Sequence, residues 1–269
     1  MMVKSPQDWG KEMRREIISM LSVAGSGHPG GSLSVTDILS VLYFDKMNIN
    51  PQNPAWSKRD RLVLCKGHAA PALYAALALR GYFPQEELSK LRKLGSNLQG
   101  HPDMKKVPGV DMSTGSLGQG LSAACGMAMA ARLDNQDYTV YAILGDGETQ
   151  EGQVWEASMF AGHYKLDNLI TLIDHNGLQI DGQTIDVLSP EPLTDKYRAF
   201  GWYVQQIDGH DTEAIAAAIE QAKAHRGQPA MIIADTVKGK GVSFMENIAD
   251  WHGKAPNQEE TIKALAELE

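Results

Sequence analysis

Residues 138–148 read YTVYAILGDGE, and residues 168–178, thirty positions further along, read NLITLIDHNGL. Each stretch is a short run of β-branched, aromatic and aliphatic residues that ends in a glycine-containing turn, as a buried strand does. The spacing is that of a strand–helix–strand unit, whose two strands lie parallel in one sheet. Because the carboxyl ends of parallel strands meet at one edge of a sheet, we expect Asp146 and Asn176 to lie close together.

Strands and helices alternate along the rest of the chain in the same way. The pattern predicts further strands at 61–65, 203–207 and 230–236, and helices at 9–24, 34–47, 69–80, 118–133, 153–164 and 214–224, with a short amphipathic helix after Pro256. Ser34 is the expected N-cap of the second helix, Gly81 ends the third, and residues 181–198 are expected to form an irregular surface loop. Such alternation predicts a three-layer α/β/α fold with a mostly parallel sheet, in a single domain over residues 1–269.

Composition excludes several classes of protein. The 269 residues include 25 Lys and Arg against 33 Asp and Glu, so the formal net charge is −8, which gives no global reason to bind nucleic acid or an anionic membrane. No apolar run has the length of a membrane span, and the first ten residues lack the apolar core of a signal peptide. Cys65 and Cys125 are too few for a disulfide framework and are both expected to be buried. We therefore expect a cytoplasmic globular protein with neither nucleic-acid nor membrane partners.

The two turns at the predicted sheet edge carry metal-binding chemistry. An Asp carboxylate, an Asn side-chain carbonyl, a backbone carbonyl and diphosphate oxygens together make the hard-oxygen site that Mg²⁺ prefers. The glycines on either side of Asp146 let the backbone approach phosphate groups, and a following helix offers its N-terminus to an anion. An isolated Gly-Asp-Gly is commonly just a turn, but Asn176 at a second strand end favours a metal–diphosphate site.

At this point the sequence resembles a known family. The Gly-Asp-Gly turn with a downstream Asp-His-Asn resembles the diphosphate-binding motif of thiamine diphosphate enzymes. Five further motifs resemble those of transketolases in kind and order: SGHPGG at 26–31, KGHA at 66–69, GHPD at 100–103, TGSLGQG at 114–120 and WHG at 251–253. Each is weak by itself, but together they span nearly the whole chain, and the chain is identified as similar to the diphosphate-binding (PP) domain of transketolases.

The resemblance implies a catalytic role for four histidines. His28, His68, His101 and His252 would line the pocket around the thiazolium ring, hold the hydroxyl and carbonyl groups of a donor ketose and shuttle protons. All four lie in Gly- and Pro-rich segments outside the predicted elements, where functional side chains concentrate, and imidazole has a suitable pKa. The other four histidines, which are His163, His175, His210 and His225, are expected to be structural; for His175, beside Asn176, a direct role is the less favoured interpretation.

The resemblance also assigns cofactor, metal and interface residues. Cofactor contacts would come from His68, Gly115, Leu117, Gly147, Asn176, Ile180 and Lys238, and the ligands of Mg²⁺ (or of Ca²⁺ or Mn²⁺) from Asp146, Asn176 and the carbonyl of Leu178. For Lys238 a solvated surface position fits nearly as well. Glu151 and Glu156 match acidic residues at an interface between subunits that are implicated in linking two active sites, although an exposed structural role fits Glu156 equally.

The resemblance covers only part of a transketolase. In that family the glutamate that activates the cofactor and most sugar-phosphate ligands lie in pyrimidine and C-terminal domains, which this chain lacks. The resemblance therefore implies the N-terminal subunit of a split transketolase, which would pair in an α₂β₂ assembly with a separately encoded C-terminal subunit. It would transfer a two-carbon ketol unit from a ketose to an aldose, both as sugars or sugar phosphates. The alternatives are a related split enzyme for a specialised ketose or for 1-deoxyxylulose-phosphate-type synthesis, and a non-catalytic assembly module.

Overall fold

One parallel sheet forms the centre of the protein, whose computed structural model describes residues 4–269. Its strands are β1 (Arg61–Leu64), β2 (Val140–Gly145), β3 (Leu169–His175), β6 (Tyr203–Asp208) and β7 (Ala230–Asp235), in the order β1–β2–β3–β7–β6. All four neighbouring pairs run parallel, and Gly145 at the end of β2 pairs in register with Asp174 in β3. A separate two-stranded ribbon, β4 (Leu178–Gln179) with β5 (Gly182–Gln183), follows directly after β3. The five predicted strands and the parallel sheet are confirmed.

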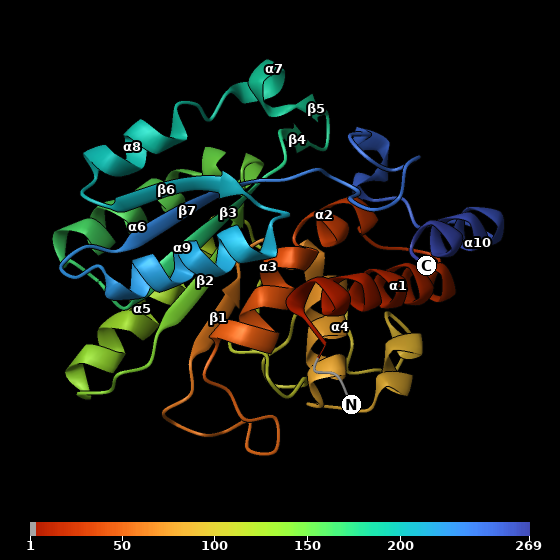
Figure 1. The fold of residues 1–269 in the computed structure, drawn as a ribbon, viewed down its shortest axis with the longest axis horizontal. Helices are drawn as coiled ribbons and strands as arrows, with labels where there is room; N and C mark the ends of the chain where they lie inside the picture. Colours follow the sequence, from red (N-terminus) through yellow and green to blue (C-terminus); the bar gives the residue numbers. More distant parts are fainter. Residues whose placement is uncertain (1–3) are drawn as a thin grey trace.

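Helices cover both faces of the sheet, as Figure 1 shows. Alternate strand residues face opposite ways, so that Tyr141 and Ile143 of β2 join one hydrophobic cluster whereas Ala142 and Leu144 join another. The first cluster is closed by α1 (Pro6–Ala24), α3 (Thr36–Val41), α4 (Ala70–Arg80) and α9 (Thr212–Ala224), and the second by α5 (Gln119–Leu133), α6 (Gly152–His163) and α8 (Leu193–Ala199). Burying apolar side chains on both faces produces the three-layer α/β/α architecture that the sequence predicts.

Local capping signals explain where several helices begin and end. Ser5 caps α1 through a reciprocal capping box with Asp8, and Gly25 ends it in the left-handed conformation at φ 65°. Gly81, at φ 95°, ends α4 as expected. The C-terminal helix α10 (Gln258–Glu267) begins with a second capping box, between Asn257 and Glu260. The predicted ends of α1 and α4 are confirmed, whereas α1 begins three residues before the predicted residue 9, at the capping box of Ser5.

Two predictions of local structure are wrong, the N-cap at Ser34 and the loop at 181–198. The helix expected at 34–47 is present as α3, which continues into a π-helical turn at Leu42–Lys46, and it is preceded by a short helix that was not predicted, α2 (Pro29–Ser34). Ser34 does not cap a helix there, because its hydroxyl donates to the buried carboxylate of Asp174 at 2.6 Å. Residues 181–198 are not an irregular loop, since they contain β5, α7 (Thr184–Leu188) and most of α8. Leu193 and Tyr197 pack α8 against the sheet. A helix this short has too few residues for its sequence to predict that contact.

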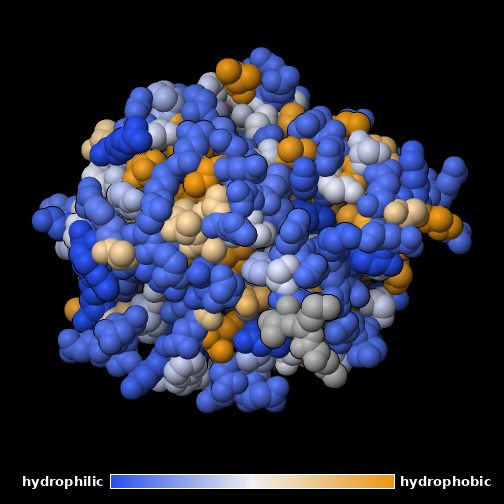
Figure 2. All heavy atoms as spheres, in the orientation of Figure 1, coloured by the Kyte–Doolittle hydropathy of each residue, from blue (hydrophilic) through white to orange (hydrophobic). Residues whose placement is uncertain are grey.

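The remaining regular segments are short 3₁₀ turns, and several lie near the carboxyl edge of the sheet. They span Gly67–Ala69, Gln85–Lys90, Gly147–Gln150 and Ala249–His252. Both cysteines are buried and unpaired, as expected. On the face seen in Figure 2 hydrophilic residues predominate and apolar residues form small groups. Among residues 4–269 no helix is both long and apolar enough to cross a membrane.

Candidate functional site

A cavity of about 190 Å³ opens at the carboxyl edge of the sheet. It collects predicted site residues from far apart in the sequence: His68, Leu117, Asp146, Gly147, Glu151, Asn176, Leu178, Ile180, Lys238 and His252. Its walls come from the segments that follow β1, β2, β3 and β7. The residues predicted from separate motifs therefore converge on one place.

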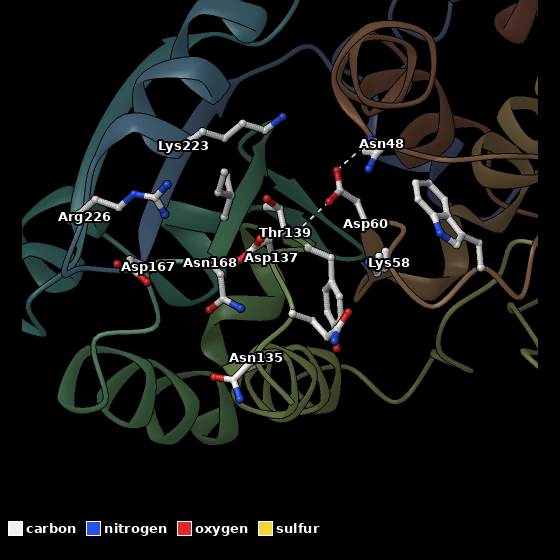
Figure 3. A pocket seen from close by; sticks show the side chains of 14 residues that line it. Asn48, Lys58, Asp60, Asn135, Asp137, Thr139, Asp167, Asn168, Lys223 and Arg226 are labelled. Atoms are coloured by element: carbon white, nitrogen blue, oxygen red, sulfur yellow. Dashed lines mark hydrogen bonds between the residues drawn. The ribbon is translucent and has the colours of Figure 1, made fainter. Parts of the chain in front are cut away.

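A larger cavity, of about 510 Å³, lies at the opposite edge of the sheet, where the strands begin (Figure 3). Its labelled side chains include Asp60, Thr139 and Asn168 ahead of β1, β2 and β3, with Lys223 and Arg226 at the end of α9. Asp60 accepts hydrogen bonds from the backbone N–H groups of Asn48 and Thr139 at 2.8 and 2.9 Å, so it joins segments of the chain. None of the residues predicted to be functional lines this cavity.

Asp146 is a buried carboxylate at the floor of the smaller cavity. Its side chain accepts the N–H of Gly147 at 2.8 Å and the N–H of Gly177 at 2.6 Å, which ties the turn after β2 to the turn after β3. The turns carrying Asp146 and Asn176 are therefore adjacent, as their spacing predicts. Burial, and secondly the negative charge of Asp174, raise the pKa of Asp146. Among the described residues no lysine, arginine or histidine forms an ion pair with it.

The groups around Asp146 fit a divalent cation held partly by a ligand. Residues 4–269 contain no group of three His, Cys, Asp or Glu side chains that could hold a metal by themselves. A cation here would instead take one carboxylate oxygen, the amide oxygen of Asn176 and the carbonyl of Leu178, and it would need further oxygens from a bound anion. A 2 % exposed carboxylate without a cationic partner is the observation that favours such an ion.

A buried ion pair lies beneath the cavity. The ammonium of Lys66, after β1, contacts the carboxylate of Asp174 in β3 and donates to the carbonyl of Gly31 at 3.0 Å. The hydroxyls of Ser34 and Thr236 also donate to Asp174. Burial alone would raise the pKa of Asp174, but the charge of Lys66 and these hydrogen bonds lower it below its usual value. Asp174 thus stays ionised and joins β1, β3, β7 and α2 into one rigid floor.

Lys238 is buried in the cavity wall and is not a solvated surface residue. Its ammonium donates to the carbonyl of Leu178 at 3.2 Å and lies 3.0 Å from Nδ1 of His252. Burial, and then the charge of Lys66, lower the pKa of Lys238 to about 8. Because the lysine donates to Nδ1, the neutral ring of His252 carries its proton on Nε2 and can donate it to a ligand.

Three of the predicted histidines form a cluster. The ring centroids of His28, His68 and His252 lie 5.1 to 5.5 Å apart. Burial lowers the pKa of His28 to about 4 and that of His252 to about 3, and it lowers the pKa of His68 well below its usual range. The cluster is therefore uncharged near neutral pH, when each ring has one donor and one acceptor nitrogen. Nδ1 of His28 is buried and has no hydrogen-bond partner among the described residues.

His101 reaches this region through close backbone contacts. A Cβ built on Gly115, at φ 137°, would lie 2.7 Å from the ring of His101, so only glycine fits against it. A Cβ on Gly67 would lie 2.6 Å from the backbone nitrogen of Gly115. Gly115 is thus packed between the His68 loop and His101. Burial, and then the charge of Arg92, lower the pKa of His101.

The acidic residues near the cavity differ in their surroundings. Glu151 is exposed and lines the cavity, whereas Glu156 is exposed on α6 and does not line it. Glu148 was not among the predicted residues; it is buried and accepts the N–H groups of Gly118 at 2.9 Å and Gly145 at 3.2 Å. Burial raises the pKa of Glu148 to about 7. Lys66 and Asp174 were not predicted either, although Lys66 belongs to the KGHA motif and Asp174 ends a predicted strand.

Two predicted contact residues leave apolar side chains open to solvent. Leu117 is 36 % exposed and Ile180 is 69 % exposed, both at the cavity. Ile185, Val187 and Leu188 of the adjoining helix α7 are likewise exposed. An apolar rim of this kind is typical of a surface that a ligand or a second protein covers.

Comparison with known proteins gives one consistent result. The family model for the thiamine diphosphate binding domain of transketolase matches residues 8–268. The chain is 53 % identical over 257 residues to the 6-deoxy-6-sulfo-D-fructose transketolase subunit SqwG of Clostridium sp. (strain MSTE9), covering 96 % of this chain and 94 % of that protein. It is 42 % identical over 268 residues to an apulose-4-phosphate transketolase subunit of Phocaeicola vulgatus, covering 100 % of this chain and 95 % of that one.

Full-length transketolases match over a smaller share of their length. Human transketolase is 46 % identical over 256 residues, which are 92 % of this chain but 39 % of that protein. The structure of transketolase from Leishmania mexicana superposes with a TM-score of 0.95 at 33 % identity, covering 99 % of this chain and 42 % of that chain. The chain thus spans about two fifths of these longer proteins.

Proposed function

This chain belongs to the transketolase family, through the thiamine diphosphate binding domain, and we propose that it is the N-terminal subunit of a split transketolase. In this role it works with a separate chain that supplies the pyrimidine and C-terminal domains, in an α₂β₂ assembly. The carrying observation is coverage: two proteins named as transketolase subunits are matched over 94 % and 95 % of their length, whereas human transketolase is matched over 39 %. The exposed Leu117, Ile180 and α7 side chains fit a partner surface at the same cavity.

The cavity at the carboxyl edge is the proposed cofactor site. Asp146, Asn176 and the Leu178 carbonyl would bind Mg²⁺, or Ca²⁺ or Mn²⁺ in its place. The backbone of Gly147, together with Lys238, would bind the diphosphate. Gly115, Leu117 and Ile180 would contact the cofactor's rings, and His68 would touch both the diphosphate and the substrate region. The cation would pair with the buried carboxylate of Asp146, and the diphosphate would pair with the buried ammonium of Lys238.

The predicted catalytic histidines supply the proton transfers of the reaction. Once bound, thiamine diphosphate supplies an electron sink for cleaving the carbon–carbon bond beside a ketose carbonyl. His28, His101 and His252 hold the hydroxyl and carbonyl groups of the donor and move protons to and from them, which neutral imidazoles do well. His252 donates through Nε2, because Lys238 occupies its Nδ1. Glu151 and Glu156 would lie at the contact between subunits.

The substrates belong to the sugars of the ketose and aldose classes. The two subunits described above are named for a sulfonated and a phosphorylated sugar, which supports a ketose donor with an anionic terminal group for this chain. A two-carbon ketol unit passes from that donor to an aldose. Neither the 1-deoxyxylulose-phosphate alternative nor a non-catalytic module gains support, since each of the similar proteins described above is a transketolase by name.

The test begins with the partner. Affinity purification of this chain from its native cells, with mass spectrometry of what co-purifies, is expected to yield a stoichiometric chain with a pyrimidine domain. That complex is then assayed for ketol transfer that depends on thiamine diphosphate and Mg²⁺, with phosphorylated ketoses, sulfonated ketoses and pyruvate as donors. A preference for pyruvate contradicts the transketolase proposal, and a complex that binds no thiamine diphosphate favours the non-catalytic module.

A further inference from the structure

His210 lies outside the cavity in a chain of hydrogen bonds that is buried at Arg14 and Asp37 and partly buried at His210. The guanidinium of Arg14 in α1 donates to both oxygens of Asp37 in α3, at 3.0 and 2.6 Å. Nδ1 of His210 lies 2.7 Å from Oδ2 of Asp37. The backbone N–H of Val237, just after β7, donates to Nε2 of His210 at 2.8 Å. The imidazole thus connects the helical layer to a loop at the carboxyl edge of the sheet.

These contacts fix the tautomer and the orientation of the ring. Because Nε2 accepts from Val237, the neutral imidazole carries its proton on Nδ1 and donates it to Asp37. Burial tends to raise the pKa of Asp37, but the hydrogen bonds and charges of His210 and Arg14 lower it, so Asp37 is an ionised acceptor. A charged acceptor strengthens the hydrogen bond and holds the ring in place. His210 therefore presents a fixed acceptor to one backbone N–H.

That N–H belongs to Val237, the residue before Lys238. On the other side of Lys238, the N–H of Gly239 donates to the carbonyl of Gly30 at 3.0 Å. Gly239 cannot shift easily, because its backbone is packed so closely against the carbonyl group of Met245 that a Cβ built there would collide with it. Lys238 is thus anchored by its two neighbours, and its ammonium then reaches the Leu178 carbonyl and Nδ1 of His252.

We propose that His210 is a positioning residue for the diphosphate site, since its bond to Val237 sets the backbone that carries the ammonium of Lys238. This inference rests on the proposed function, in which Lys238 binds the diphosphate. His210 lies in none of the motifs of the site, and its effect on diphosphate binding is indirect, through Lys238. A purely structural histidine would stabilise the fold equally through either nitrogen, whereas a positioning histidine acts through Nε2 alone.

Two substitutions separate these roles. In His210→Gln the amide oxygen takes the place of Nε2 and can accept from Val237, while the bond to Asp37 is lost. In His210→Asn the amide nitrogen takes the place of Nδ1 and can donate to Asp37, while the acceptor for Val237 is lost. Each variant loses one hydrogen bond, so similar losses in melting temperature are expected, and this measurement serves as the control for folding.

The readout is the concentration of thiamine diphosphate that gives half-maximal activity in the complex with its partner, at saturating Mg²⁺. We expect His210→Asn to raise it about fivefold, the usual effect of one lost hydrogen bond, and His210→Gln to change it by less than about twofold. At saturating cofactor the kcat of both variants is expected to stay within about twofold of the original. Equal increases in the two variants, or no increase in His210→Asn, overturn the inference.

A second measurement is independent of turnover. Titration calorimetry measures the affinity of the complex for inorganic pyrophosphate in the presence of Mg²⁺. We expect the same order, with weaker binding to the His210→Asn complex than to the His210→Gln complex. If the complex performs no ketol transfer but pyrophosphate binding shows this order, the proposed function fails and the positioning role stands. If the unmodified protein binds no pyrophosphate, or the variants bind it equally, the positioning role fails.

Discussion

The two edges of the sheet each have a cavity, and the larger of the two contains no predicted functional residue. At the amino edge the cavity measures about 510 Å³, and at the carboxyl edge about 190 Å³. Two of the three carboxylates of the larger cavity are used within the fold, since Asp60 accepts two backbone N–H groups and Asp167 pairs with Arg132, whereas the third, Asp137, is exposed to solvent. At the carboxyl edge Asp146 has no such cation, and His28 has a buried nitrogen without a partner among residues 4–269.

The direction of the strands explains this difference. In a parallel α/β sheet the segments after the strands, and the N-termini of the following helices, gather at the carboxyl edge. Helix N-termini favour anions, whereas helix C-termini, such as that of α9 beside Lys223 and Arg226, meet at the amino edge. Cavity volume does not single out the carboxyl edge, and the amino edge also has a buried oxygen, that of Asn168, without a partner in the described part of the chain. The buried carboxylate of Asp146, which lacks a cationic partner among the described residues, is the feature that favours the carboxyl edge as the proposed site.

The largest effect is expected when one carboxylate at each edge is replaced and the two variants are compared. Asp146→Ala is expected to weaken Mg²⁺-dependent binding of thiamine diphosphate by on the order of 100-fold or more, because it removes the only charged metal ligand proposed here. Asp60→Asn, the control at the amino edge, should lower the melting temperature and leave cofactor affinity within about twofold. Titration calorimetry measures both, and similar losses of affinity in the two variants would show that the edges do not differ in function.

Within the carboxyl edge, binding and turnover should separate. His101→Ala is expected to lower kcat/KM for the donor by about 100-fold, since its proposed role is proton transfer and donor binding. Cofactor affinity should be unchanged, because His101 does not line the cavity that contains Asp146. His163→Ala, on the exposed end of α6, is the control and should alter neither quantity. A loss of cofactor affinity in His101→Ala would contradict the proposal that the metal site and the donor site are separate.

Stability should depend on pH through the carboxyl edge. The pKa of His28 is about 4 in the folded protein and about 6.5 when the chain is unfolded. Between these values the unfolded chain binds more protons, so the free energy of unfolding decreases as pH falls from 6.5 towards 4. Replacement by asparagine, which does not titrate, should flatten this slope. Denaturant unfolding between about pH 4 and about pH 7 measures it, and an unchanged slope in His28→Asn would show that His28 is not buried in its neutral form.

The smallest effect is expected at the amino edge. Arg226 is exposed, and no ion pair joins it to another described residue. Arg226→Ala should change cofactor affinity and turnover by less than about twofold and stability by about 0.5 kcal/mol. The same assays and a melting curve are sufficient, with Lys58→Ala as a second variant in this cavity. A large loss of activity in either variant would give the larger cavity a function.

Much of the scaffold could be predicted from the sequence, because its signals are local. Apolar runs locate the five strands, and Ser5, Gly25 and Gly81 carry the capping chemistry that bounds α1 and α4. The helix predicted at 34–47 is found as α3 and the π-helical turn after it, but its predicted N-cap is wrong, because Ser34 ends α2 and donates to Asp174 instead. The short helices α7 and α8 have too few turns to show a period and depend on burial of residues such as Tyr197.

The candidate site divides in the same way. The thirty-residue spacing is sufficient to bring the Asp146 and Asn176 turns together, and the motif histidines stand out because they lie in glycine-rich loops. The ion pair of Lys66 with Asp174 could not be predicted, because its partners lie 108 positions apart. The sequence is compatible with either a buried or a solvated Lys238, and the packing around the side chain shows that it is buried.

The alternating α/β fold, the edge of the sheet where we propose the site, and the family to which the chain belongs all follow from the sequence alone. They rest on periodicity, turn chemistry and the order of short motifs, which act over a few residues. The tertiary structure was needed to show which side chains share the cavity, which charges lack partners, and that His210 joins Asp37 to the loop of Lys238. Hydrogen bonding and desolvation depend on neighbours brought from distant parts of the chain, and no local pattern encodes them.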